Sequence, residues 1–330
     1  MSEKRNYKLY GLSISSDRKI ELLEECESTS TDVVVEWVPS LPEEALDSFR
    51  WERVSTDLLD LVDEIALFES PSDSGLQTRL DINTPTGGKL RIIVAADRSK
   101  AKIQFDPEIA ASDLDSYFVG PIMSFILRLS GVVSLHASAV VVDEVAIAFV
   151  GSSTSGKSTL AAGMARTGSL VLADDIAAIR EVGNRFEVSP GYTRVRLRPG
   201  AAAHLTGGIE GLDRVYGHRD SFYYSENSDE MFAGRSFPLG AVYLLGSVGI
   251  EYRIPRVEAV EGREKLLKLV ENASGLYFVR GDMRTNEFGV LSKLAARIPI
   301  RRLFHAHEID TLDAQCEIIR SDIRKIIDSQ

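Results

Sequence analysis

Eight consecutive residues, 151–158, match the pattern G-x-x-x-x-G-K-[ST]. Glycines at both ends let the backbone turn tightly, so that successive N–H groups form a cradle for phosphate oxygens. Lys157 would reach the β- and γ-phosphates, and Ser158 would supply its hydroxyl to Mg²⁺. An apolar run precedes the pattern and a helix-forming run follows it, which favours a nucleoside triphosphate site over an ordinary Gly/Ser-rich turn. The residues of this predicted site are Gly151, Ser152, Ser153, Thr154, Ser155, Gly156, Lys157, Ser158 and Thr159.

Two adjacent carboxylates, Asp174 and Asp175, close an apolar stretch a short distance after this phosphate loop. Nucleotide enzymes place a magnesium-binding carboxylate at such a position. One acid could hold Mg²⁺ directly or through water, and the other could accept the proton of an attacking hydroxyl. Neighbouring side chains at a strand end point in different directions, so the two need not share one role. The alternative is that the pair only opens a polar turn.

Three arginines, Arg194, Arg196 and Arg198, alternate along a basic segment that we predict to be a strand. Alternate residues of a strand share one face, so they would form a positive strip. Guanidinium groups meet phosphate bidentately and could stabilise a transferring phosphoryl group or hold an acidic acceptor. The alternative is that these arginines lie on a solvated edge strand. Arg235 is a further, weaker candidate for a residue that contacts the phosphoryl group or the acceptor.

The composition is that of an ordinary globular protein, with a formal net charge of -11. An acidic protein without a Lys/Arg cluster is not expected to bind DNA or RNA. Cys26 and Cys316 lie far apart and belong to no Cys/His cluster, so we expect neither a disulfide framework nor a structural zinc site. No apolar segment resembles a signal peptide or a membrane span. We therefore expect a cytoplasmic protein with no membrane partner.

Two domains are predicted from the order of the elements. Residues 1–111 contain short β-rich runs separated by turn formers, among them residues 7–12, which we expect to be one strand. A capped helix near residues 112–129 then opens the second domain, residues 112–330.

The second domain begins with a predicted hairpin of residues 133–142 and 145–150, whose second strand leads into the phosphate loop. Residues 207–234 are rich in Gly, charge and Tyr, and predict a mobile surface loop rather than core. Tyr216, Tyr223 and Tyr224 in this segment could grip a peptide, although packing of the rings on the domain itself is the better expectation.

Three motifs occur in the order and spacing of the HPr kinase/phosphorylase catalytic core, which the chain resembles: residues 135–140, the phosphate loop and residues 172–175. The resemblance implies an α/β (α+β) fold of the phosphoenolpyruvate-carboxykinase-like P-loop kinases, with a mixed β-sheet and flanking helices. A smaller strand-rich N-terminal domain would precede this core in the chain. The resemblance also implies that His136 lies near the reacting phosphate, that Asp174 is the catalytic base and that Asp175 binds Mg²⁺, although the two aspartates could exchange roles. Without the resemblance, His136 would more often be a core histidine.

Looser motifs, residues 7–12, 196–199, 237–243 and 298–303, are similar to those of stand-alone HPr-kinase-like serine kinases. Some of these accompany lasso-peptide clusters and phosphorylate a serine of the precursor peptide. The glycine-rich second signature that HPr kinase/phosphorylases use in phosphorolysis has no counterpart in residues 209–214, so reversible dephosphorylation of HPr is not expected. Those enzymes form hexamers, so this chain is a candidate homo-oligomer.

Together these features predict a kinase that uses ATP and Mg²⁺ to phosphorylate a serine of a peptide or small protein. A nucleotide-dependent switch or ATPase without kinase activity is the alternative, and a kinase of a small-molecule hydroxyl is a third possibility. The predicted catalytic residues are Asp174, His136, Lys157, Arg196 and Arg198. The predicted metal ligands are Ser158 and Asp175.

Overall fold

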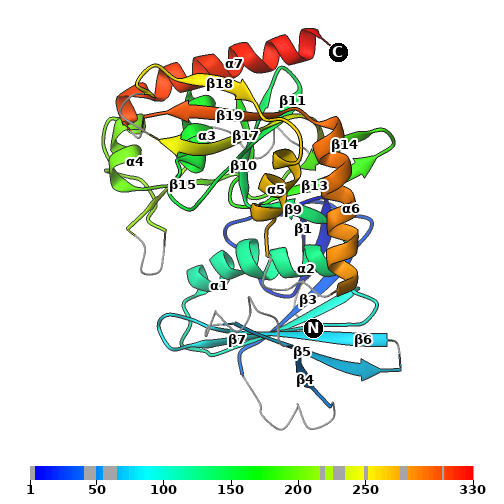
Figure 1. The fold of residues 1–330 in the computed structure, drawn as a ribbon. Coiled ribbons are helices and arrows are strands. Elements are labelled where there is room, and N and C mark those ends of the chain that lie inside the picture. Colours follow the sequence, from blue (N-terminus) through cyan, green and yellow to red (C-terminus); the bar gives the residue numbers. More distant parts are fainter. Residues whose placement is uncertain are drawn as a thin grey trace. The chain divides into compact units, whose positions relative to one another are not determined.

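The computed structural model divides the chain into two compact units (Figure 1). Unit 1 comprises Met1–Ser130 with Gly275–Gly281, and unit 2 comprises Gly131–Ser274 with Asp282–Gln330. The residues that the structure describes are 4–40, 50–54, 65–73, 75–215, 220–225, 235–248, 252–275, 281–306 and 308–329.

Unit 1 is built on an eight-stranded sheet with the strand order β1-β2-β3-β8-β7-β6-β5-β4. Buried and less buried residues alternate along β3 and β7, as expected where one face of a sheet covers a core. The strands are β1 (Arg5–Leu9), β2 (Leu12–Ser16), β3 (Val33–Val38), β4 (Glu52–Val54), β5 (Ile65–Ser72), β6 (Gly75–Asn83), β7 (Lys89–Val94) and β8 (Lys100–Phe105).

The single strand predicted at residues 7–12 is wrong, because the chain reverses within it. Tyr10 and Gly11 have φ values of 56° and 75°, and they join β1 to β2 as an antiparallel hairpin. Positive φ at both central residues is typical of the tight turns that suit the twist of a hairpin. Gly11 suits this conformation, but tyrosine rarely takes it, so Tyr10 is not recognisable as a turn residue.

A helical run belongs to unit 1 and not, as predicted, to the second domain. It consists of α1 (Ala111–Tyr117), the π-helical η3 (Phe118–Ile122) and α2 (Met123–Leu129). The Phe118 ring lies 5.7 Å from that of Trp37 in β3, and the Tyr10 hydroxyl donates a hydrogen bond to Val119 O. Because the run buries its apolar side chains with those of this sheet, the units divide at Ser130/Gly131 and not at 111/112.

Unit 2 is a mixed sheet in which β12, β10, β11, β17, β14, β13 and β9 are successive neighbours, and β19 pairs with both β17 and β18. A separate two-stranded sheet contains β15 (Val195–Leu197) and β16 (Phe222–Tyr224). The strands of the large sheet are β9 (Val133–Leu135), β10 (Ala137–Val142), β11 (Val145–Val150), β12 (Leu170–Ala173), β13 (Ala177–Val182), β14 (Arg185–Ser189), β17 (Phe237–Val248), β18 (Arg256–Ala259) and β19 (Ile300–His305).

The predicted strand 133–142 is two strands, because the chain changes its neighbours at His136. β9 pairs with β13, whereas β10 pairs with β11 and β12. Between them the His136 N–H donates to Asn272 O at 2.7 Å and so leaves the regular ladder. A histidine at such a break is free to turn its ring away from the sheet.

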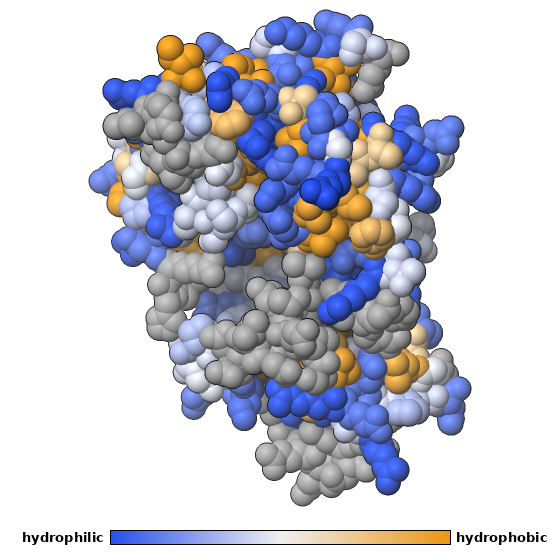
Figure 2. Space-filling view, viewed as in Figure 1, coloured by the Kyte–Doolittle hydropathy of each residue, from blue (hydrophilic) through white to orange (hydrophobic). Residues whose placement is uncertain are grey.

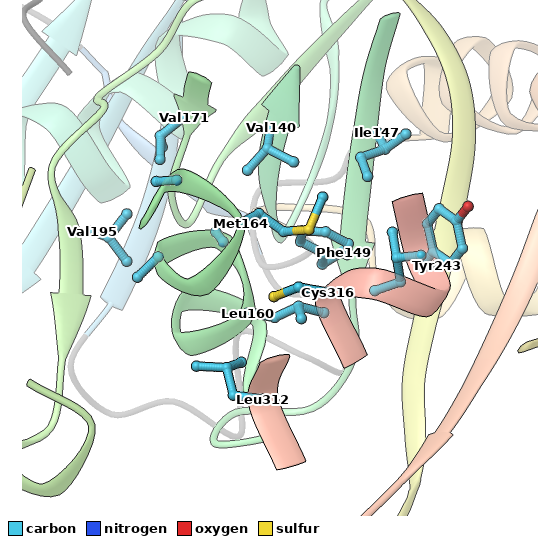
Figure 3. Close-up of a cluster of buried hydrophobic side chains, with 14 of the residues drawn as sticks. Val140, Ile147, Phe149, Leu160, Met164, Val171, Val195, Tyr243, Leu312 and Cys316 are labelled. Atoms are coloured by element: carbon cyan, nitrogen blue, oxygen red, sulfur yellow. The ribbon is translucent and has the colours of Figure 1, made fainter. Parts of the chain in front are cut away.

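The helices of unit 2 cover this sheet (Figure 1). Leu160 and Met164 of the helix after the phosphate loop belong to one buried cluster with sheet residues such as Phe149 and with Leu312 and Cys316 of the last helix (Figure 3). The helices are α3 (Lys157–Arg166), α4 (Pro199–Thr206), α5 (Glu264–Glu271), α6 (Gly281–Arg297), the 3₁₀ helix η7 (Ile309–Thr311) and α7 (Leu312–Asp328).

The contact between α3 and α7 is close. A Cβ added to Gly163 would lie 2.9 Å from Leu312 Cγ, so this position requires glycine. The sheet and α7 together therefore fix the helix that follows the phosphate loop.

The described part of the segment 207–234, which was predicted to be a surface loop, contributes to the core. Phe222 and Tyr224 of β16 are 3% and 4% exposed and belong to the same cluster as α3. Tyr216 lies outside the described residues. The α/β class with mixed sheets and flanking helices is confirmed, and the assignment to the P-loop kinase core stays a prediction.

The surface carries small hydrophobic patches among hydrophilic residues on the face shown in Figure 2. Among the residues that the structure describes, the exposed large hydrophobic side chains are those of Leu76, Val182, Ile254, Leu267 and Phe288. In the described part of the chain we find no helix with the length and apolar character needed to cross a bilayer.

Candidate phosphate and carboxylate site

Strand direction brings the predicted functional residues to one edge of the sheet in unit 2. β10 runs antiparallel to both β11 and β12, so the ends of β11 and β12 lie beside the start of β10. Gly151 follows β11, Asp174 follows β12, and His136 and Ser138 lie at the start of β10. The edge thus combines the phosphate loop with two further motifs of the sequence.

The phosphate loop has the backbone that its glycines predict. A Cβ on Gly151 would lie 2.3 Å from Leu245 O of β17, so no other residue fits there. Gly156 has a φ of 97° and is the N-cap of α3, where no side chain caps the helix. The first N–H groups of α3 are therefore available to an anion.

A second feature of the loop also fits a phosphate. Ser155 Oγ is buried and has no hydrogen-bond partner among the described residues. An oxygen acceptor at this point would satisfy it. Ser152, Ser153 and Thr154 are exposed, and Thr159 is half-buried in the first turn of α3.

Lys157 is 6% exposed and turns its ammonium group back onto the loop. Its Nζ donates to Gly151 O at 2.8 Å and to Ser152 O at 3.1 Å. Burial lowers the pKa of Lys157, against the opposing effect of Asp175 and Asp174. The side chain is thus held at the mouth of the cradle.

Asp174 is 2% exposed and is held by three donors. Ser138 Oγ donates to Oδ1 at 2.5 Å, and the Arg196 N–H donates to Oδ2 at 3.1 Å. Ser158 Oγ lies 3.0 and 3.2 Å from the two carboxylate oxygens. The aspartate in contact with the serine of the phosphate loop is therefore Asp174.

No ion pair is formed by this buried carboxylate among the described residues. Burial, together with the charge of Asp175, raises the pKa of Asp174 from 3.8 to about 6. Within the described ranges no cationic side chain lies within salt-bridge distance of it. A divalent cation beside Ser158 would supply the missing charge.

The described residues contain no cluster of three or more His, Cys, Asp or Glu side chains arranged to hold a metal ion. Mg²⁺ needs no such cluster, because it is commonly held by one or two carboxylates, substrate phosphates and waters. Ser158 and Asp174 therefore fit a magnesium ion that arrives with a nucleotide.

Asp175 is more open than its neighbour, with 38% of its side chain exposed. Its backbone has a φ of 68°, a left-handed conformation that turns the chain sharply after β12. Its Oδ2 lies 3.4 Å from Arg196 Nη1, and its backbone O lies 3.1 Å from His136 Nδ1. Asp175 thus faces the accessible side of the site.

His136 contacts Asp175 through the backbone. Burial and the charge of Lys157 lower the pKa of His136, so the ring is neutral at pH 7. A carbonyl oxygen can only accept a hydrogen bond, so the contact places the ring proton on Nδ1. Nε2 then remains as an acceptor.

The arginine strip is only partly as predicted. Val195 and Leu197 are buried in the core, so Arg196 lies on the other face of β15, while Arg194 immediately precedes the strand and pairs with Asp213. Arg196 reaches Asp175 and pairs in register with Tyr223, and its buried Nε has no hydrogen-bond partner among the described residues.

Two arginines lie apart from this face. Arg198 is exposed at the N-cap of α4. Arg235 pairs with Glu144, which lies in the turn at the opposite end of the β10–β11 hairpin from the phosphate loop, so the structure excludes it from the site.

The residue that sequence reasoning passed over is Ser138. It lies within a quoted motif, but an isolated serine in an apolar strand gave no sign of a role. A signal was present in the run Ala-Ser-Ala-Val-Val-Val, where Ser138 is the only polar side chain of a strand buried along its length.

Comparison with known proteins adds little to this geometry. No protein-family model matches the chain, and no curated protein matches it. Among solved structures, the chain is similar to the Hpr(Ser) kinase/phosphatase from Coxiella burnetii, with 13% sequence identity and a TM-score of 0.31. The match covers 59% of this chain and 98% of the other. A likeness at this TM-score carries no weight for function.

Proposed function

We propose that this protein is a Mg²⁺- and ATP-dependent kinase that transfers the γ-phosphoryl group to a serine hydroxyl of a peptide or small protein. The observation that carries the proposal is the hydrogen-bonded pair of Ser158 and Asp174 beside the more open Asp175. A hydroxyl from the phosphate loop and a strand-end carboxylate are the protein ligands that phosphoryl-transfer enzymes of this type present to Mg²⁺.

The two aspartates exchange the roles that the sequence suggested. Asp174 is buried and contacts Ser158, so we assign it to the metal. A general base must come within hydrogen-bond distance of the acceptor hydroxyl, and only a group open to an incoming substrate can do so. Asp175, with its exposed side chain, is therefore the proposed base.

The other residues would position the transferring group and stabilise its charge. Lys157 would exchange the carbonyls of Gly151 and Ser152 for phosphate oxygens. Arg196 would hold Asp175 in place and present its unpartnered Nε to the γ-phosphate. Mg²⁺ would neutralise the charge that develops on the phosphate oxygens. Catalysis of this kind depends mainly on positioning and electrostatics.

The acceptor is proposed from the sequence resemblance. The chain resembles stand-alone HPr-kinase-like serine kinases, some of which act on lasso-peptide precursors, so a precursor peptide of this type is the first acceptor to test. The net charge of -11 disfavours a nucleic acid acceptor.

The test is incubation of the full chain with γ-labelled ATP, Mg²⁺ and the peptides encoded beside its gene. We expect label on a peptide serine, and release of all label to water would instead favour an ATPase or switch. Asp175→Asn should keep Mg²⁺-dependent nucleotide binding but lose transfer, whereas Lys157→Ala should weaken both.

Asp143→Asn is the matched control, because Asp143 lies at the far turn of the β10–β11 hairpin, paired with Arg324. It should transfer phosphate at the wild-type rate. Normal transfer by Asp175→Asn would contradict the assignment of the base.

A further inference from the structure

We propose that Ser138 is a positioning residue for the metal carboxylate, and that a one-residue bulge in β12 brings it to Asp174. The inference rests on the proposed function, since it concerns the Mg²⁺ that Asp174 and Ser158 would hold. Ser138 itself touches neither nucleotide nor metal in this proposal.

The bulge is seen in the register of β10 against β12. Val140 pairs with Val171, but Ala139 pairs with Ala173, so Leu172 is an extra residue on β12. If this register continues by one residue, Ser138 lies opposite Asp174. Without the bulge, Ser138 would lie opposite Ala173. Side chains directly opposite each other in an antiparallel pair lie on one face and touch, and bulges often redirect a side chain beside an active site.

The resulting contact between Ser138 and Asp174 is short and buried. Ser138 is 0% exposed, and its Oγ lies 2.5 Å from Asp174 Oδ1, the distance of a strong hydrogen bond from a hydroxyl to a carboxylate. A buried hydroxyl costs free energy unless it is hydrogen-bonded, so an alanine would serve a purely structural purpose better in this strand. The hydroxyl is therefore explained by the carboxylate that it holds.

Three donors fix the plane of this carboxylate from different sides. Ser138 binds Oδ1, the Arg196 N–H binds Oδ2, and Ser158 lies near both oxygens. Ser158 can donate its proton to Asp174 and still turn a lone pair toward Mg²⁺. Removal of Ser138 would release the Oδ1 side, so the carboxylate would no longer be held in the orientation that the ion needs. Loss of such an outer partner typically weakens metal binding by roughly 10- to 100-fold.

The test is a Mg²⁺ titration of fluorescent ADP bound to the full chain, compared with the same ADP in EDTA. For Ser138→Ala we expect the half-saturating Mg²⁺ concentration to rise at least about tenfold, with ADP binding in EDTA unchanged. A merely structural serine would alter both measurements or neither.

Ser189→Ala is the matched control, because Ser189 of β14 is also a buried strand serine, but its hydroxyl hydrogen-bonds to the Ser236 hydroxyl and not to a carboxylate. It should titrate like the wild type. Ser138→Cys keeps nearly the same volume with a weak donor, and it should show an intermediate shift even if the alanine variant fails to fold.

Wild-type-like titration of both Ser138 variants would overturn the inference and leave the proposed function standing. If the wild type itself shows no Mg²⁺-dependent gain in ADP affinity, the proposed function fails, and the inference fails with it.

Discussion

Replacement of Asp174 by asparagine should make the protein more stable while it ends Mg²⁺-dependent nucleotide binding. The native structure buries this carboxylate without a cation, which raises its pKa from 3.8 to about 6. An asparagine has no charge to bury. Its amide can keep all three contacts, with its oxygen toward the Arg196 N–H and its nitrogen toward Ser138 and Ser158.

The size of the effect follows from linkage between protonation and folding. A carboxyl group whose pKa is raised on folding binds its proton more tightly in the native state, so stability falls as the pH rises from about 3.8 through about 6. The shift corresponds to about 3 kcal/mol at pH 7.5, about half of that at pH 5 and less than about 1 kcal/mol at pH 4. Asp174→Asn should gain these amounts of unfolding free energy.

Urea unfolding in EDTA measures the gain. Both tryptophans, Trp37 and Trp51, lie in unit 1, so their fluorescence follows that unit, while far-UV circular dichroism also reports unit 2. The midpoint of the unit 2 transition should rise at pH 7.5 and approach the wild-type value at pH 4. Asp143→Asn is the control, because its exposed ion pair with Arg324 should contribute little to stability. Equal or lower stability of Asp174→Asn at pH 7.5 would refute the reasoning.

Three other experiments, two substitutions and one cysteine modification, test the fold. Gly151→Ala should abolish binding of fluorescent ADP, because its Cβ would lie 2.3 Å from Leu245 O, and a wild-type affinity would contradict the loop geometry. Burial raises the pKa of Cys316 to about 12, so iodoacetamide at pH 8 should modify the half-buried Cys26 in the native protein and reach Cys316 only in urea, as intact mass would show. Leu312→Ala should cost roughly 2–5 kcal/mol in urea unfolding, since it empties the contact between α7 and α3, and a loss below about 1 kcal/mol would mean that α7 packs loosely.

Much of the site could be predicted from the sequence because its parts are local. The spacing of Gly151, Gly156 and Lys157 predicts a phosphate loop in any fold that places a strand before it and a helix after it. The apolar run before Asp174 likewise predicts a strand that ends in a carboxylate. Neither inference needs to know which strands are neighbours.

The roles that we propose for Asp174 and Asp175 could not be assigned from the sequence, because they rest on contacts that depend on strand register. The extra residue Leu172 decides which side chain meets Ser138, and nothing in the composition of β12 reveals a bulge. Local sequence also does not predict the left-handed backbone of Asp175 or the contact between its carbonyl and His136. These are contacts between segments far apart in the chain.

One strand and one turn could not be predicted for a different reason. Residues 222–224 lie in a segment rich in glycine and charge, a composition that predicts a loop, although Phe222 and Tyr224 of β16 pack in the core beside α3. The turn at Tyr10 could not be predicted, because tyrosine seldom adopts positive φ. In both cases tertiary packing overrides local preference.

The packing of α3 against α7 has a consequence for biosynthesis. The helix behind the phosphate loop is buried partly by residues 312–326, which the ribosome makes long after residues 157–166. During translation the apolar side of α3 stays uncovered until α7 has been made, so the proposed nucleotide site cannot reach its final form before then. Most of unit 1 is made first and can fold meanwhile, since domains generally fold as units in the order of synthesis. A nascent chain of this protein should therefore acquire its nucleotide affinity late, as one of its last steps of maturation.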